Sequence, residues 1–161
     1  MAAASTKDVG DRLHNINAQV LKPAYTAGTL VCRRYWPTNF HESALHPLIV
    51  PVPGARLGVN NPPAGAEIVH YTRTWNLVLV LGATLQGLPV ESVQKAGETL
   101  LDLLIDVYAA RPNLELAGEL DGVVKISFPD DAGITTMLDN QLAVIRFPIE
   151  VTLRKAVSYA R

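Results

Sequence analysis

Residues 66–83 read AEIVHYTRTWNLVLVLGA, and this stretch decides the fold. Its first half alternates side chains with the period of two that is typical of a β-strand. From Leu77 to Leu81 both alternating positions are apolar, which indicates a sheet covered on both faces. The pattern predicts one strand of about 16 residues, well beyond the usual 5–6. We therefore expect residues 66–76 to project beyond the core with unpaired backbone groups, which would pair with a strand of a neighbouring subunit.

Upstream, the sequence predicts an amphipathic helix over residues 6–21. Ser5 or Thr6 is expected to cap its first turn, and Pro23 is expected to end it. Apolar residues recur there at helical spacing and predict one buried stripe. The stripe consists of Val9, Leu13, Ile16 and Val20.

Two shorter strands are expected between this helix and the long strand. Residues 29–36 are rich in β-branched and aromatic side chains, which favour a strand. Residues 48–53 are apolar but contain prolines, so this strand should lie at an edge or end early. Residues 54–66 contain several Gly, Asn and Pro residues and are expected to form an exposed loop or the tip of an arm.

Downstream of the long strand, Gly87-Leu88-Pro89 predicts a turn, followed by a second helix that ends near Arg111. Strands are then expected over residues 124–128 and 142–157, because apolar side chains recur at every second position. Residues 156–161 are expected to form a C-terminal tail. The order of elements indicates a single α+β domain over residues 1–161. We expect a mainly antiparallel sheet of about four to five strands with two helices packed on one face.

The composition argues against several classes of function. The chain has 14 basic and 15 acidic residues and a net charge of −1, so it lacks the basic surplus of proteins that grip nucleic acid. Its one cysteine, Cys32, cannot form an internal disulfide, which favours a reducing compartment. The N-terminal residues lack the apolar core of a signal peptide, and the apolar run 77–85 is too short to cross a bilayer.

No motif for metal, cofactor or catalytic chemistry meets its geometric requirement. His41 and His46 are five residues apart, whereas the zinc motif needs two histidines four apart on one helix face. The strand-to-helix connection 82–89 lacks the lysine of a phosphate-binding loop. Asp102 and Asp106 fall at the margin of the buried stripe, where a solvated helix face is expected. We expect no metal, no cofactor and no enzymatic activity.

Two groups of residues are candidates for contacts with other proteins. Basic and aromatic residues of the kind enriched at interfaces occur together over 33–36. Together with the projecting strand, they give the candidate subunit or tube interface: Arg33, Arg34, Tyr35, Trp36, Ile68, His70, Thr72 and Arg73. In the last strand, polar side chains on one face are candidates for a lumen or for contact with a neighbouring ring: Arg146, Glu150 and Arg154.

Residues 71–81, the Gly-Leu-Pro turn, the helix ending in YAARP at 108–112 and the closing run VIRFPIEVT at 144–152 together resemble the tail terminator proteins of long-tailed bacteriophages. The proline-rich run 47–53 is also similar to that family. The resemblance covers most of residues 6–155. It implies a virion protein, made in the host cytoplasm, that forms a ring, commonly a hexamer, at the head-proximal end of the tail.

By the same resemblance, the partners would be further copies of the chain, the major tail tube protein and a head–tail connector or stopper protein. Such a ring ends tube polymerisation and joins the tail to the head, while DNA passes through its lumen without specific binding. Two alternatives stay open. The chain could be another neck component, such as a stopper or connector completion protein. It could also be a small ligand-binding domain or enzyme whose site is assembled from distant residues.

Overall fold

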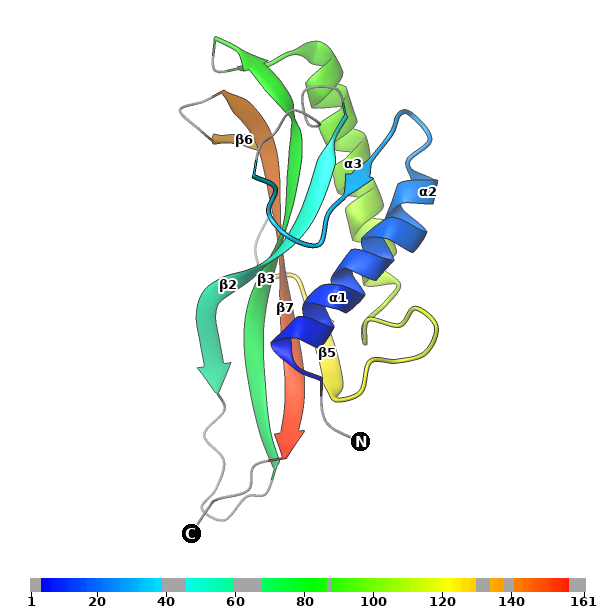
Figure 1. The fold of residues 1–161 in the computed structure, drawn as a ribbon, viewed down its shortest axis with the longest axis vertical. Coiled ribbons are helices and arrows are strands. Elements are labelled where there is room, and N and C mark those ends of the chain that lie inside the picture. The colour runs from blue at the N-terminus through cyan, green and yellow to red at the C-terminus, as the bar shows by residue number, and fades with distance from the viewer. Residues whose placement is uncertain are drawn as a thin grey trace.

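Three long strands run the length of the molecule, with the helices packed beside them (Figure 1). The computed structural model describes residues 4–38, 46–59, 68–86, 88–129, 134–137 and 141–156. The elements are α1 (Thr6–Ile16), the π-helical turn η1 (Asn17–Leu21), α2 (Lys22–Ala24), β1 (Val31–Cys32), β2 (Leu48–Val59), β3 (Ile68–Leu85), β4 (Leu88–Pro89), α3 (Glu91–Ala109), β5 (Val123–Ser127), β6 (Ile134–Met137) and β7 (Leu142–Ala156).

The strands form one curled sheet in a mixed fold of the α+β kind. Its main path follows the order β1-β2-β3-β7-β5, and the short strands β4 and β6 pair with β3 and β7. Only the pair β1–β2 is parallel, so the sheet is mainly antiparallel. With β4 and β6 the sheet has seven strands among the described residues, more than the four to five expected from the sequence.

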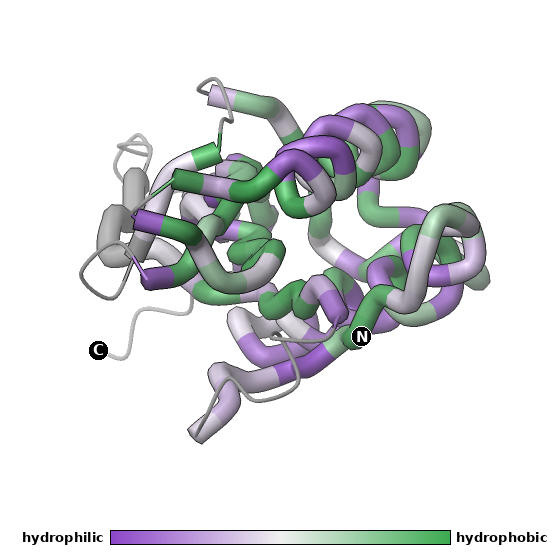
Figure 2. The backbone as a smooth tube through the Cα atoms, turned by 90° about the horizontal axis from the view of Figure 1, so that it is seen from above, coloured by the Kyte–Doolittle hydropathy of each residue, from purple (hydrophilic) through white to green (hydrophobic). Residues whose placement is uncertain are grey.

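The main core lies between the helices and one set of alternating strand residues. From β3 it takes Trp75, Leu77 and Leu79, and from the neighbouring β7 it takes Ile145, Phe147 and Ile149, among others. The helices contribute their apolar stripes, including Leu13 of α1 and Leu104 of α3. Figure 2 shows the corresponding alternation of hydrophilic and hydrophobic residues along the helical coils. The two long helices are amphipathic, and burial of their apolar sides against the sheet is the main force that holds the layers together.

The intervening residues of the same strands point to the opposite face of the sheet, as the two-residue period requires. In the upper half of that face, Leu48, Val50, Val80 and Val144 form a second, smaller apolar cluster. In the lower half the same positions are polar. This division explains why residues 77–81 are apolar on both sides whereas residues 68–76 are apolar on one side only.

The expectation of unpaired backbone groups is wrong for residues 68–76, and residues 66 and 67 lie outside the described part. Every residue from Ile68 to Asn76 pairs with β7, and β2 covers most of the other side, from Tyr71 to Asn76. Among the described residues, Ile68, Val69 and His70 lack a β2 partner, as does Thr74 at the bulge between Pro53 and Leu57. The long strand is therefore completed within a single subunit, and it gives no argument for assembly by strand pairing.

The strand that pairs with this part of β3 is the proline-containing β2. It runs to Val59 instead of ending near Pro53. The carbonyl groups of Pro47 and Ile49 accept hydrogen bonds from Val31 and Arg33, so odd-numbered residues direct their backbone groups away from β3. Backbone direction alternates along a strand, and Pro51 and Pro53 therefore lack an N–H only on the outer edge. Residues 54–59 of the expected loop are thus strand, and residues 60–66 lie outside the described part.

The first helix is also longer than expected, because it continues through Pro23 to Ala24. Ser5 is the N-cap, as expected, and forms a capping box with Asp8. The wide turn Asn17–Leu21 precedes the proline, and there the N–H of Lys22 bonds to the carbonyl of Asn17. In an α-helix the ring of Pro23 would clash with the carbonyl four residues earlier, and a π turn relieves that clash.

Several smaller expectations also change. The strand expected over residues 29–36 is limited to Val31–Cys32, and the expected turn at 87–89 contains β4, which pairs back onto β3. Strand β6 was not expected from the sequence. The last strand ends at Ala156, and the rest of the expected tail lies outside the described residues. None of the described helices combines the length and the apolar character that a membrane crossing requires.

Candidate functional site

A groove beside the outer edge of β2 is the clearest candidate binding site. It has a volume of ≈ 540 Å³ and is lined by Thr6, Lys7, Arg34, Tyr35, Trp36, Pro51, Val52, Pro53 and Trp75. Most of this lining is apolar or aromatic. Tyr35 and Trp36 are 65% and 45% exposed, although side chains of this size are usually covered. Exposed aromatic and basic residues around an apolar floor are typical of protein–protein interfaces.

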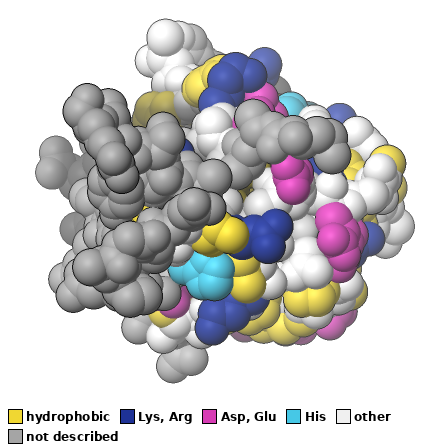
Figure 3. Space-filling model, turned by 90° about the horizontal axis from the view of Figure 1, so that it is seen from below, with side chains coloured by type: hydrophobic (Ala, Val, Ile, Leu, Met, Phe, Trp, Pro, Cys, Tyr) yellow, Lys and Arg dark blue, Asp and Glu magenta, His cyan; other side chains and the backbone are white. Residues whose placement is uncertain are grey.

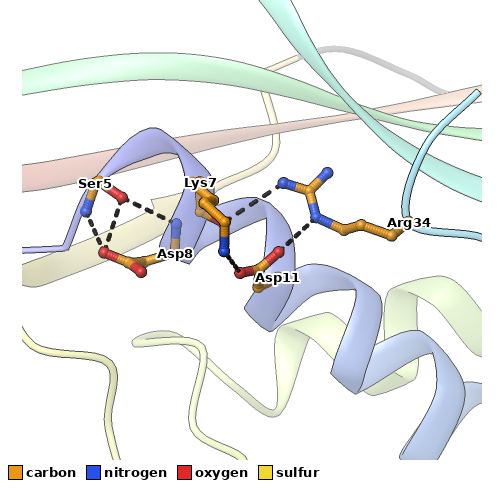
Figure 4. A network of polar contacts seen from close by, with 5 residues as sticks. All are labelled: Ser5, Lys7, Asp8, Asp11 and Arg34. Carbon is orange, nitrogen blue, oxygen red and sulfur yellow. Dashed lines mark hydrogen bonds and ion pairs between the residues drawn. The ribbon is translucent and has the colours of Figure 1, made fainter.

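The basic rim of the groove is fixed by a network of polar contacts at the start of α1 (Figure 4). Asp11 accepts hydrogen bonds from Lys7 Nζ at 2.7 Å and from Arg34 Nε at 2.8 Å. The Lys7 ammonium, followed by the Arg34 guanidinium, lowers the pKa of Asp11, and Asp11 in turn raises the pKa of Lys7. The guanidinium of Arg34 also lies 4.5 Å from the ring centroid of Tyr35. One carboxylate therefore holds the segment after β1 against α1.

The same end of α1 is held by its capping box. The backbone N–H of Ser5 donates to Asp8 at 2.8 Å, and the backbone N–H of Asp8 donates to Ser5 Oγ at 3.1 Å. The hydrogen bond from the Ser5 backbone is the main reason that the pKa of Asp8 is lowered. A capped first turn gives Lys7 and Asp11 a fixed place on the wall of the groove.

The structure brings together only part of the interface predicted from the sequence. Arg34, Tyr35 and Trp36 line the groove, and the adjacent Arg33 extends the β1–β2 pairing through its N–H. The remaining candidates lie on the lower half of β3, where they divide between two faces. Ile68, His70 and Thr72 point to the face opposite the helices, whereas Arg73 shares the helix side with Trp75.

The three candidates on β7 share the face that holds His70 and Thr72. Arg146, Glu150 and Arg154 are the cross-strand partners of Val78, Thr74 and His70. Arg146 and Arg154 are exposed, and Glu150 is half-buried. Figure 3, which views the molecule from below, shows basic side chains beside a histidine at this end.

Hydrogen bonds between side chains stabilise this polar face. The hydroxyl groups of Thr72 and Thr152 lie 2.9 Å apart, and Ser127 Oγ donates to Glu150 at 3.3 Å. These residues form a solvated sheet surface with basic side chains along one margin.

A second exposed apolar surface lies at the other end of the sheet. Leu85 and Leu88 face each other across the β3–β4 hairpin and are 67% and 70% exposed. Val90, directly before α3, is also exposed. We define Leu85, Leu88 and Val90 as the hairpin tip; Figure 1 shows the hairpin at the top of the molecule.

The interior contains one buried polar group that links the two helices. Tyr108 of α3 donates its hydroxyl to Asn17 Oδ1 at 2.6 Å, and Asn17 Nδ2 has no partner among the described residues. Burial raises the pKa of Tyr108 well above its ordinary value, and burial raises the pKa of Cys32 to about 11. The bond from Tyr108 to Asn17 ties α3 to the π turn, and both residues lie apart from the groove lining.

The residues considered for chemistry lie apart where the structure describes them. His41 lies outside the described residues, and His46 and His70 are exposed. Asp102 and Asp106 are exposed on α3. Within the described ranges, no three His, Cys, Asp or Glu side chains are grouped so that they could hold a metal ion. A second cleft of ≈ 450 Å³ beside β5 is lined by Glu119, Asp121 and Arg154, among others.

Sequence reasoning missed two parts of this surface. Pro51 and Pro53 predict an edge strand or an early end of the strand, but not that they form one side of the groove. Leu85 and Leu88 were interpreted as part of a plain connection, but they form the hairpin tip. The available signal was Gly87 between the two leucines, because glycine marks turns in a sequence.

No protein-family model matches the chain, and no curated protein matches it in sequence. Function is therefore inferred from three surfaces of the structure: the groove, the polar sheet face and the hairpin tip.

Proposed function

We propose that this chain is a structural protein of a long-tailed bacteriophage, which forms a ring that caps the tail tube and joins the tail to the head connector. The observation behind this proposal is the groove with its exposed Tyr35 and Trp36 and its basic rim. Large exposed aromatic side chains around an apolar floor favour a lasting contact with another protein.

Three further features support a role in assembly. In this proposal the two helices form one layer on a single face of the sheet. The opposite, polar face, with Arg146, Glu150 and Arg154, is then available for contact with a partner. The hairpin tip gives the molecule a second apolar surface. The sequence pattern of the long strand, the following helix and the closing strand resembles that of tail terminators.

The experiment is a tube-length assay with purified tail tube protein of the same phage. Tube protein is allowed to polymerise with and without the chain, and lengths are measured by negative-stain electron microscopy. The proposal predicts shorter tubes with a ring on one end. Tubes of unchanged length without attached protein would contradict it.

Two variants locate the contact. Trp36→Ala should weaken capping because Trp36 lies in the groove, whereas Val124→Ala, a change at another exposed apolar residue, should leave it intact. Binding to a portal or connector ring, without binding to tube, would instead favour the alternative that the chain is another neck component.

A further inference from the structure

The molecule has two exposed apolar surfaces that differ in shape. The groove beside β2 is concave, and the hairpin tip is a protrusion of three apolar side chains. A contact between different surfaces of identical copies is heterologous, and a series of such contacts closes into a ring when the rotation between copies allows it.

One copy cannot bring its own tip to its own groove. The groove includes Val52, which pairs with Asn76 of β3, and the tip includes Leu85 of the same strand. The strand from Asn76 to Leu85 spans about 30 Å at 3.3 Å per residue. Because β3 is a rigid central strand, its tip can enter only the groove of a second copy.

The charges around the two surfaces are complementary. Two cations, Lys7 and Arg34, line the groove, and both bond to Asp11, which leaves a net charge of +1. Helix α3 starts directly after the tip. In its first two turns Glu91 forms an ion pair with Lys95, and the exposed Glu98 leaves a net charge of −1. Opposite charges favour association of the tip with the groove and oppose contact between two tips.

We propose that the hairpin tip of one copy docks in the β2 groove of the next, with Leu85 and Leu88 against Tyr35, Trp36 and Pro53, and with the start of α3 beside Lys7 and Arg34. The occupant of the groove is thus a second copy of this chain. The inference rests on the proposed ring and names the contact that builds it. The outer edge of β2 accepts the tip through side chains, because Pro51 and Pro53 have no N–H for strand addition.

A crosslinking experiment on the full-length chain tests this contact. Trp36→Cys and Leu88→Cys chains of different tag length are mixed under mild oxidation and separated on a non-reducing gel. The proposal predicts a mixed dimer, and a single chain with both substitutions should give a ladder of covalent oligomers. The matched control pairs Leu88→Cys with Val124→Cys, an exposed apolar position on β5. Wild-type chain controls for Cys32.

Two supporting variants keep the test decisive. Tyr35→Cys replaces Trp36→Cys if the latter does not fold, as judged by circular dichroism. Leu88→Ser should weaken self-association by about tenfold or more, the size expected for a central interface residue.

The outcomes separate the two proposals. Specific crosslinking of the groove to the tip supports the contact. Wild-type chain that assembles while groove and tip do not crosslink, or crosslink no better than the control, overturns the contact and leaves the ring proposal standing. Wild-type chain that stays monomeric in the presence of tube protein overturns both.

Discussion

Replacing Gly10 with alanine tests how Arg34 is held against α1. Gly10 is buried on the helix, and a Cβ there would lie 2.9 Å from Nη1 of Arg34 and closer still to two other atoms of the guanidinium. Arg34 would have to move, which would break its 2.8 Å ion pair with Asp11. The substitution therefore has two opposing effects on stability.

The two effects are of similar size. Alanine is better than glycine inside a helix by about 0.8–1.0 kcal/mol. A partly exposed ion pair of this kind contributes about 0.2–1 kcal/mol. We expect Gly10→Ala to change the free energy of unfolding by less than about 0.5 kcal/mol in the wild-type chain, because the gain and the loss offset each other. When Arg34→Ala has already removed the obstruction, the same substitution should stabilise the chain by about 0.8–1.0 kcal/mol.

Urea unfolding of the four chains, followed by circular dichroism, measures this double-mutant cycle. The coupling energy between positions 10 and 34 should exceed the 0.3–0.5 kcal/mol scatter of roughly independent sites. Equal stabilisation by Gly10→Ala in both backgrounds would show that Arg34 does not lie over the helix as described. If the coupling is found, Gly10→Ala should also weaken self-association, since it displaces one wall of the groove.

Three further predictions concern the scaffold. Tyr108→Phe removes the hydroxyl that donates to Asn17 Oδ1 and should lower the free energy of unfolding by about 1–3 kcal/mol. Adding Asn17→Leu should recover much of that loss. Strictly additive losses of the two substitutions in urea unfolding would contradict the buried hydrogen bond. Gly54→Ala places a Cβ 2.7 Å from the carbonyl oxygen of Thr74 on the neighbouring strand and should cost about 1–3 kcal/mol, so an unchanged melting temperature would refute the β2–β3 register there. Cys32 has its pKa raised from 9.0 to about 11 by burial, so at pH 8 it should react with iodoacetamide roughly a hundredfold more slowly in the folded than in the urea-unfolded chain. Because the raised pKa disfavours the thiolate only in the folded state, the free energy of unfolding should fall as pH rises from 9 to 11, by on the order of 1 kcal/mol after allowance for partial exposure. Equal alkylation rates in the folded and unfolded chains would exclude the burial.

The sequence predicts the broad fold well because periodicity reports which side of an element is buried. The stripe through Val9, Leu13 and Ile16 is buried in α1, and the alternating apolar residues of the last strand enter the core as expected. The class of the fold and the long strand follow from the same signal. These are local patterns, which need no knowledge of the partner element.

The failures concern partners that are distant in sequence. Pro51 and Pro53 indicate an edge, but only the register with β1 and β3 shows that their missing N–H groups point outward and let the strand continue to Val59. That continuation pairs residues 71–73, which the sequence had predicted to be unpaired. Similarly, the groove joins residues of α1, the segment after β1, β2 and β3, so no spacing in the sequence could reveal it. The aromatic and basic composition of residues 33–36 indicated part of it.

Native mass spectrometry of the purified full-length chain, over a range of concentrations, measures assembly most directly. Heterologous tip-to-groove contacts that close on themselves predict one dominant species at a fixed multiple of the 17.4 kDa subunit, with few intermediates and with reversible loss in high salt. A 17.4 kDa species at every concentration, unchanged when tail tube protein is added, would contradict the account.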